Sequence, residues 1–161
     1  MRQKSDMNTR PVSEGFDLEQ FLPYLLNQAA EITSRNFHAT YREDYGITRP
    51  QWRVLANLGK FGRMTARDIC RISHIEKTKV SRAVAALEAG GYLSREVNPR
   101  DRRAGILSLT DKGAETYSKL GRRAITYDQT LRSRLGPDLA GQLDATLKAL
   151  IAQGTGAAEE D

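Results

Sequence analysis

The sequence predicts a mainly α-helical protein with one small two-stranded β-hairpin, and three observations support this fold class. Apolar residues recur at three- and four-residue spacings on both sides of the centre, as they do on one face of an α-helix. Two short β-prone runs stand at residues 93–97 and 106–109, with the turn-forming segment 98–101 after the first. The positive net charge of +5 is concentrated in the central third of the chain.

Length and composition narrow the class of protein further. A chain of 161 residues suits one compact domain with extensions, and it is too short for a large two-domain enzyme. The single cysteine, Cys70, excludes an internal disulfide, and with only two histidines we expect no metal site and no cofactor. No apolar run approaches the ~20 residues that a membrane span needs, and the polar start resembles no secretory signal. We therefore expect a cytoplasmic protein without a membrane partner.

The N-terminal region divides into an arm and a helix. Residues 1–16 show no apolar periodicity, so we expect a disordered arm. Residues 17–47 form the next segment, in which an amphipathic helix runs from an N-cap at Asp17 to about residue 44 and Gly46 ends it. Pro23 either kinks this helix or marks its true first turn.

Residues 48–109 carry the signals of a winged helix-turn-helix. Thr48 and Thr65 stand at N-cap positions before two helices that end near residues 59–62 and 72. After a tight connection, a further helix spans about 76–89 and stops at a pair of glycines. A short helix, a tight turn, a second helix and a hairpin in this order are typical of a winged helix-turn-helix DNA-binding unit.

Residues 110–153 form two further helices, separated by a Gly-Pro stop-and-start signal at 136–137. Residues 154–161 are small and acidic, and we expect a disordered tail. The apolar stripes of the helices at both chain ends exceed what a small winged unit can cover. These terminal helices are therefore the expected interface of a homodimer.

The charge distribution points to double-stranded DNA as a partner. Residues 60–103 hold eleven basic and five acidic side chains, whereas the rest of the chain holds 14 and 15. Such a positive patch is the electrostatic footprint of a polyanion-binding protein. On the helix at 76–89, hydroxyl and cationic side chains lie in the first two turns, the part that a recognition helix presents to the major groove. The hairpin tip is rich in arginine, which suits the minor groove. The DNA-binding residues predicted in this way are Lys77, Thr78, Lys79, Ser81, Arg82, Arg100, Asp101, Arg102 and Arg103.

Three segments of the sequence together resemble the MarR family of bacterial transcriptional regulators. They are the wing from Asp101-Arg102-Arg103 to Leu109-Thr110 and Gly113, the run Lys77-Thr78-Lys79-Val80-Ser81-Arg82 with Gly91-Tyr92-Leu93, and Gly46-Ile47-Thr48-Arg49-Pro50-Gln51-Trp52. The resemblance implies a homodimer that binds a pseudo-palindromic operator, usually as a repressor. It also implies release of DNA by a small aromatic acid or phenolic ligand. Candidate ligand-binding residues are Tyr24, Asn27, His38, Trp52 and Arg53, although Trp52 also suits a core position.

Two alternatives to a ligand-responsive regulator remain open from the sequence. A non-specific architectural DNA-binding protein would share the basic segment but would need neither a palindromic site nor a ligand pocket. An enzyme is disfavoured, because the sequence holds no nucleophile motif, phosphate loop or paired His/Cys ligands. One branch of the resembled family senses peroxides through a cysteine near the N-terminus; Cys70 lies elsewhere, in a segment expected to pack into the core.

Overall fold

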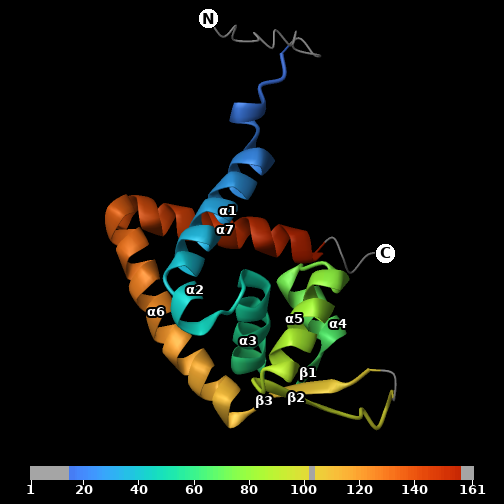
Figure 1. Ribbon diagram of the computed structural model, residues 1–161. Helices are drawn as coiled ribbons and strands as arrows, with labels where there is room; N and C mark the ends of the chain where they lie inside the picture. The colour runs from blue at the N-terminus through green and yellow to red at the C-terminus, as the bar shows by residue number, and fades with distance from the viewer. Residues whose placement is uncertain (1–14, 102–103, 157–161) are drawn as a thin grey trace, which may run out of the picture. The chain divides into compact units, whose positions relative to one another are not determined.

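The computed structural model describes residues 15–101 and 104–156. Two units divide the chain, residues 1–36 and residues 37–161. Among the described residues, helices predominate and one small sheet lies in the second unit (Figure 1). This architecture confirms the predicted mainly α-helical fold class.

The described part of the first unit is a short 3₁₀ turn, η1 (Leu18–Gln20), followed by most of helix α1 (Leu22–Ala39). Asp17 caps η1, since its Oδ1 accepts a hydrogen bond of 2.9 Å from the Glu19 N–H. Pro23 lies in the first turn of α1, where a backbone N–H would have no partner within the helix. Of the two predicted roles for Pro23, marking the first turn is therefore confirmed.

The second unit begins with the last residues of α1 and the four-residue helix α2 (Arg42–Tyr45). The prediction of one continuous helix from residue 17 to residue 44 is wrong, because the backbone leaves helical geometry at Tyr41 (φ −134°). Tyr41 is only 1% exposed, and its ring packs at an angle on those of Phe37 and His38. Burial of this aromatic side chain accompanies the break. Gly46, with φ 62°, ends α2 as predicted.

Helices α3 (Arg49–Phe61), α4 (Ala66–Ser73) and α5 (Lys77–Ala89) surround the core of the second unit. Thr48 begins α3 with a capping box in which Thr48 Oγ1 accepts from the Gln51 N–H and Gln51 Oε1 accepts from the Thr48 N–H. The most completely buried aliphatic side chains come from these helices, from the sheet and from α6: Val54, Leu55, Ile69, Val80, Val84, Leu87, Leu107 and Leu120. The core therefore joins the three helices to the sheet that follows them.

The sheet has three strands, one more than the sequence predicts. Its strands are β1 (Met64–Thr65), β2 (Leu93–Glu96) and β3 (Ile106–Leu109), all antiparallel in the order β1-β3-β2. The predicted hairpin is β2–β3, with Leu93 opposite Leu109. The additional strand β1 pairs Met64 with Leu107, and its two residues are too few to show an alternating pattern.

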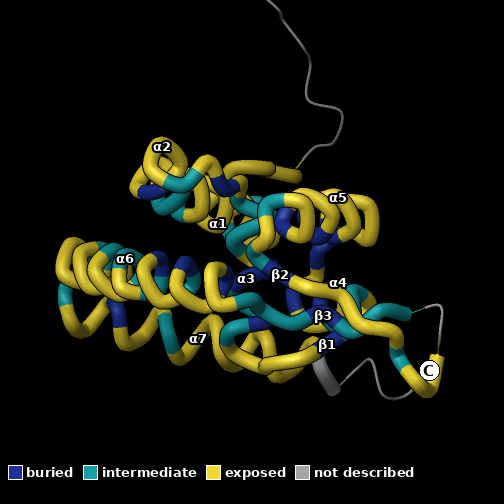
Figure 2. The backbone as a smooth tube through the Cα atoms, turned by 60° about the horizontal axis from the view of Figure 1, so that its bottom comes forward, coloured by how far each residue is buried: buried dark blue, intermediate teal, exposed yellow. Residues whose placement is uncertain are grey.

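Two helices complete the described chain, α6 (Asp111–Leu135) and α7 (Pro137–Gly156). Gly136, with φ 83°, ends α6, and Pro137 begins α7 at once. Tyr117 of α6 stacks on Trp52 of α3, with ring centroids 6.3 Å apart. Helix α7 extends three residues into the segment predicted to be a disordered tail. Most residues of α6 and α7 are exposed (Figure 2).

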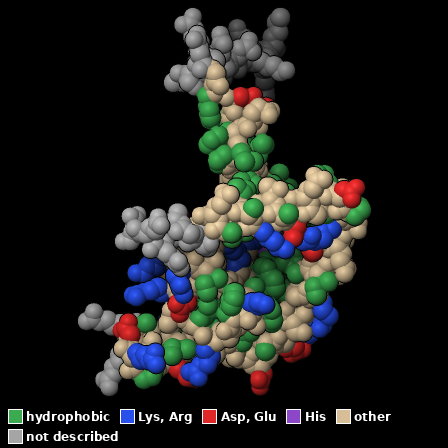
Figure 3. All heavy atoms as spheres, turned by 180° about the vertical axis from the view of Figure 1, so that it is seen from behind, with side chains coloured by type: hydrophobic (Ala, Val, Ile, Leu, Met, Phe, Trp, Pro, Cys, Tyr) green, Lys and Arg blue, Asp and Glu red, His purple; other side chains and the backbone are tan. Residues whose placement is uncertain are grey.

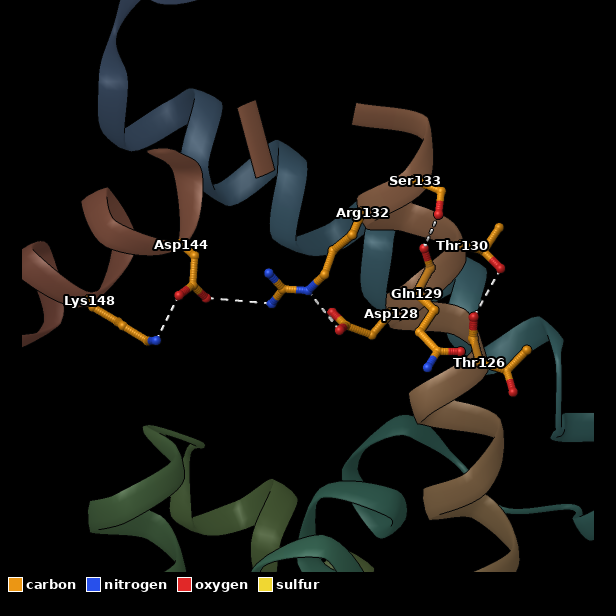
Figure 4. A network of polar contacts seen from close by, with 8 residues as sticks. All are labelled: Thr126, Asp128, Gln129, Thr130, Arg132, Ser133, Asp144 and Lys148. Carbon is orange, nitrogen blue, oxygen red and sulfur yellow. Dashed lines mark hydrogen bonds and ion pairs between the residues drawn. The ribbon is translucent and has the colours of Figure 1, made fainter. Parts of the chain in front are cut away.

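A chain of charged side chains joins α6 to α7 (Figure 4). Arg132 Nε donates to Asp128 Oδ2 at 2.7 Å, and Arg132 Nη2 lies 3.4 Å from Asp144 Oδ1. Lys148 Nζ donates to the other oxygen of Asp144 at 2.6 Å. Hydrogen bonds from Lys148 and from Arg132 hold the pKa of the Asp144 carboxyl below its usual value. The network fastens the two helices together near their turn.

Candidate nucleic-acid interface

Helix α5 has one buried face and one exposed polar face. Val80, Ala83, Val84 and Leu87 are buried, at spacings that place them on the same side of the helix. Five side chains predicted to contact DNA lie away from this stripe, and all are exposed: Lys77, Thr78, Lys79, Ser81 and Arg82. The structure therefore gathers them on the solvent side of the first two turns. Lys79 Nζ lies 3.5 Å from Glu76 Oε2, an exposed ion pair in the first turn.

Local features of the sequence define both ends of α4. Thr65 begins α4 with a capping box; Thr65 Oγ1 donates to Asp68 Oδ2 at 2.7 Å, and the Thr65 N–H donates to the same oxygen at 3.0 Å. These bonds, helped by Arg71, hold the pKa of the Asp68 carboxyl below its usual value. At the other end of α4, His74 adopts a left-handed conformation (φ 50°). This residue reverses the chain between the two helices.

Arg53 of α3 also supports the turn between α4 and α5. Its Nη2 donates a hydrogen bond of 2.6 Å to the carbonyl oxygen of Ser73, the last residue of α4. Ser73 is buried, and its hydroxyl donates back to the carbonyl of Ile69. A charge-assisted hydrogen bond to a helix C-terminus is favourable, because the terminal carbonyls carry partial negative charge. Arg53 thus ties α3 to the end of α4.

A groove of about 340 Å³ adjoins the exposed face of α5. Its walls come from β1, α4, α5, β2 and the two residues before β3, namely Thr65, Ala66, Arg67, Cys70, Lys77, Ser81, Arg95, Ala104 and Gly105. Three cationic side chains, Arg67, Lys77 and Arg95, therefore border one concave surface. A group of Lys and Arg side chains is visible around α4 and the sheet in Figure 3. Such a surface focuses a positive potential on an anionic partner.

Arg67 and Arg95 were not predicted as site residues. Arg95 reaches the groove because β2 lies beside α5 and because Gly105 leaves room for its side chain, where a Cβ would collide with the Arg95 Cγ. Arg95 Nη2 lies 3.2 Å from Glu88 Oε2 on α5, and on the neighbouring residue of β2 Glu96 pairs with Arg63. In the sequence, Arg67 and Arg95 could be recognised only as members of the basic segment 60–103.

The wing begins with a side-chain turn at Asn98. Asn98 Oδ1 accepts a hydrogen bond of 3.0 Å from the Arg100 N–H, and the Ala104 N–H donates to the Asp101 carbonyl at 3.0 Å. Arg100 and Asp101 are exposed. Arg102 and Arg103, also predicted to contact DNA, lie outside the described residues.

The five candidate ligand-binding residues are distributed over both units. Tyr24 and Asn27 belong to α1 within the first unit. In the second unit, His38 and Trp52 both border the ring of Tyr41, and His38 Nε2 lies 3.1 Å from the Ile47 carbonyl oxygen. Trp52 is also part of the aromatic packing on the core, and Arg53 is engaged at Ser73 as described above. Their role in ligand binding stays a prediction.

The described residues offer neither a metal site nor a membrane span. No cluster of three or more His, Cys, Asp or Glu side chains within residues 15–101 and 104–156 is arranged to hold a metal ion. Over the same described part of the chain, no helix combines the length and apolarity needed to cross a membrane. Cys70 is partly buried against the core at the wall of the groove.

Comparison with known proteins supports the interpretation of this surface. Residues 45–104 match the model of the MarR family. The HTH-type transcriptional repressor MdtR of Bacillus subtilis is 34% identical over 85 residues, which are 52% of this chain and 55% of that protein. The MarR family transcriptional regulator SPO1453 from Silicibacter pomeroyi has a similar structure (TM-score 0.74, 28% identity), with 85% of this chain and 97% of that chain covered.

A further structural neighbour is BpsR of Bordetella bronchiseptica, whose DNA binding is regulated by 6-hydroxynicotinic acid. It shares the fold with a TM-score of 0.73 and 21% sequence identity, and the match covers 84% of this chain and 96% of that chain. MdtR and SPO1453 are transcriptional regulators rather than enzymes. The family match covers α3, β1, α4, α5 and β2, and so includes the exposed face of α5 and every groove residue except Gly105. Residues 45–104 thus match the MarR family of transcriptional regulators, and the winged helix-turn-helix fold of the chain is that of solved regulators of this family.

Proposed function

We propose that this regulator binds a pseudo-palindromic DNA operator as a homodimer and represses transcription. In this proposal the N-terminal half of α5 enters the major groove, where Arg82 contacts a base edge or a phosphate. Lys77 and Lys79 contact phosphates, and the hydroxyls of Thr78 and Ser81 approach the DNA closely. The wing, with Arg100, Asp101, Arg102 and Arg103, lies in the adjacent minor groove. The observation that carries the proposal is the exposed cationic face of α5 beside a groove bordered by two further cationic side chains, Arg67 and Arg95.

Exposed apolar side chains on the terminal helices support the dimer. Leu139, Leu143, Leu147, Leu150 and Ile151 of α7 are between 37% and 66% exposed. In the first unit, Phe16, Leu18, Phe21, Leu22 and Leu25 are 45% to 57% exposed. Contiguous apolar surface of this kind marks an interaction site more often than a free surface. Two recognition helices in one dimer would then read two half-sites about one turn of DNA apart.

We extend the proposal to release of DNA by a small aromatic acid or phenol. The regulation of BpsR by 6-hydroxynicotinic acid makes this class of compound the first to test. A ligand that binds the dimer more tightly without DNA than with it shifts the population away from the complex, and DNA weakens the ligand by the same factor. Tyr24, Asn27, His38, Trp52 and Arg53 are the residues to substitute if such a ligand binds.

Selection from a random duplex library with the full-length chain tests the function. We expect a palindromic motif to emerge and to bind about 10³-fold or more tightly than random DNA at the same salt concentration. Sedimentation of the complex should give two chains per duplex. Equal affinity for all sequences, with a steep dependence on salt, would instead identify a non-specific architectural protein.

A further inference from the structure

The first turn of α6 holds the C-terminal end of α5 through two side chains. Thr110, the N-cap of α6, donates a hydrogen bond from its hydroxyl to the Gly91 carbonyl oxygen at 2.6 Å. Lys112 Nζ donates to the Gly90 carbonyl oxygen at 2.7 Å. Carbonyls at the end of a helix lack partners within that helix and carry partial negative charge. The start of α6 therefore supplies donors for the exit of α5.

Tyr92, which connects α5 to β2, meets the same turn of α6. The Thr110 N–H donates to the Tyr92 carbonyl oxygen at 3.1 Å, and Lys112 Nζ lies 4.2 Å from the centre of the Tyr92 ring. The Gly113 N–H completes the junction by donating to Thr110 Oγ1 at 3.1 Å. Four contacts thus join three consecutive residues, Gly90 to Tyr92, to the first turn of α6.

Gly113 makes this close approach possible. It is buried, and a Cβ built on it would overlap the Tyr92 carbonyl oxygen, far inside van der Waals contact distance. The obstructing atom belongs to the backbone, so a side chain at this position could be accommodated only if α6 moved away from Tyr92. The backbone of α6 at Gly113 therefore lies directly against the backbone at Tyr92, with no side chain between them.

We propose that this junction, made by Thr110, Lys112 and Gly113, sets the spacing of the operator half-sites that the dimer accepts. The inference rests on the proposed function, in which α5 reads DNA and the terminal helices form the dimer. None of the three residues belongs to the exposed face of α5, so we treat each as a positioning residue. The junction is one of the contacts that orient α6 relative to α5; the other is the packing of α6 on α3 and the core, at Tyr117 and Leu120.

The length of α6 turns a small rotation at the junction into a large displacement. Its 25 residues span about 37 Å at the helical rise of ~1.5 Å per residue. A rotation of about 5° at one end moves the other end by about 3 Å. This is close to the ~3.4 Å between successive bases of one DNA strand. A loosened junction should therefore admit operators whose half-sites are one base pair too close or too far apart.

Binding to the selected operator, and to versions with one or two base pairs inserted or deleted at its centre, tests the inference. We expect Gly113→Ala to reduce the discrimination between correct and altered spacing about tenfold, whereas Gly121→Ala on the same helix should leave it unchanged. A Cβ at Gly121 would meet nothing within 4 Å. Alanine normally stabilises a helix relative to glycine. A loss of spacing discrimination in Gly113→Ala but not in Gly121→Ala therefore reports the close approach at residue 113.

Substitutions of Thr110 keep the test decisive if Gly113→Ala does not fold. Thr110→Val removes the hydroxyl bonds and should reduce spacing discrimination, and Thr110→Ser should restore it. Thr48→Val is the matched control, because it removes the cap of α3 far along the chain from the junction. Lys112→Met, at an exposed position, adds a third variant that removes the bond to Gly90.

The dimer dissociation constant and the slope of affinity against salt should stay at wild-type values in these variants, since neither the interface nor the DNA contacts change. Wild-type discrimination in Thr110→Val and Lys112→Met would overturn the inference and leave the proposed function standing. A wild-type protein that accepts all spacings equally, or binds as a monomer, would overturn both.

Discussion

The guanidinium of Arg95 lies 3.2 Å from the carboxylate of Glu88, and this ion pair joins β2 to the C-terminal half of α5. Both side chains are about 40% exposed, so the pair itself adds little to stability. Its effect is geometric. The Arg95 side chain is held across Gly105 at the wall of the groove, beside the face of α5 proposed to meet DNA.

We predict that Arg95→Ala weakens binding to all DNA sequences by a similar factor. If Arg95 contacts one phosphate per subunit, the slope of log affinity against log salt concentration should become shallower by about 0.9 for each half-site. Glu88→Gln should strengthen binding at low salt, because it removes a negative charge beside the groove. Fluorescence anisotropy over a salt series measures both. A slope that Arg95→Ala leaves unchanged would remove Arg95 from the interface.

Arg82→Ala should have a different signature, because Arg82 lies on the exposed face of α5 rather than in the wall of the groove. We expect a loss of about 1–3 kcal/mol for the selected operator, with a smaller loss for random DNA, if its guanidinium contacts a base edge. Dimerisation should not change. Arg122→Ala, an exposed arginine on α6, is the control. An equal loss for all sequences would reassign Arg82 to a phosphate.

Much of the fold could be predicted because its boundaries are marked by local chemistry. Thr48, Thr65 and Thr110 each cap the helix that the sequence assigned to them. The strand β1 could not be predicted, because its two residues gain strand geometry only from pairing with β3. The break at Tyr41 was missed for a similar reason: its position fits the helical period of apolar residues, and only the tertiary core determines that its ring turns inward.

The candidate site was predictable where one helix carries it and not where several elements meet. The exposed residues of α5 follow from its apolar period alone, since Val80, Val84 and Leu87 define the opposite face. Arg67 and Arg95 are 28 positions apart and come together only because α4 and β2 both pack beside α5. No local pattern carries that information.

A charged substitution on α7 should separate dimer formation from folding. Ile151 is 66% exposed, so Ile151→Glu should leave the unfolding of the isolated chain nearly unchanged. If this residue is buried between subunits, the dimer dissociation constant should rise about tenfold or more, because burial of an isoleucine is worth about 1.5–3 kcal/mol. Sedimentation velocity over a range of concentrations measures this change, with Gln142→Glu as the exposed control on the same helix. A dimer of wild-type strength would place the interface elsewhere.

Tyr41 should make the stability of the protein fall steeply in alkaline solution. Burial raises the pKa of Tyr41 to about 12 from its ordinary value of 10.0, and the nearby charge of Arg49 only partly opposes this. The unfolded chain therefore loses the phenolic proton near pH 10, while the folded chain keeps it until about pH 12. The contribution is fully present below pH 10.0 and disappears as the pH rises toward 12, by about 2–3 kcal/mol in total.

Tyr41→Phe isolates this effect, because every lysine and every other tyrosine is the same in the wild type and in the variant. We expect the unfolding free energy of the wild type, from urea titrations at about pH 9, 10 and 11, to fall faster than that of the variant by about 1.4 kcal/mol per pH unit above pH 10. Parallel curves for the two proteins would mean that the Tyr41 hydroxyl ionises as readily in the folded chain as in the unfolded one. The ring would then have to lie within reach of water, contrary to its position against Phe37 and His38.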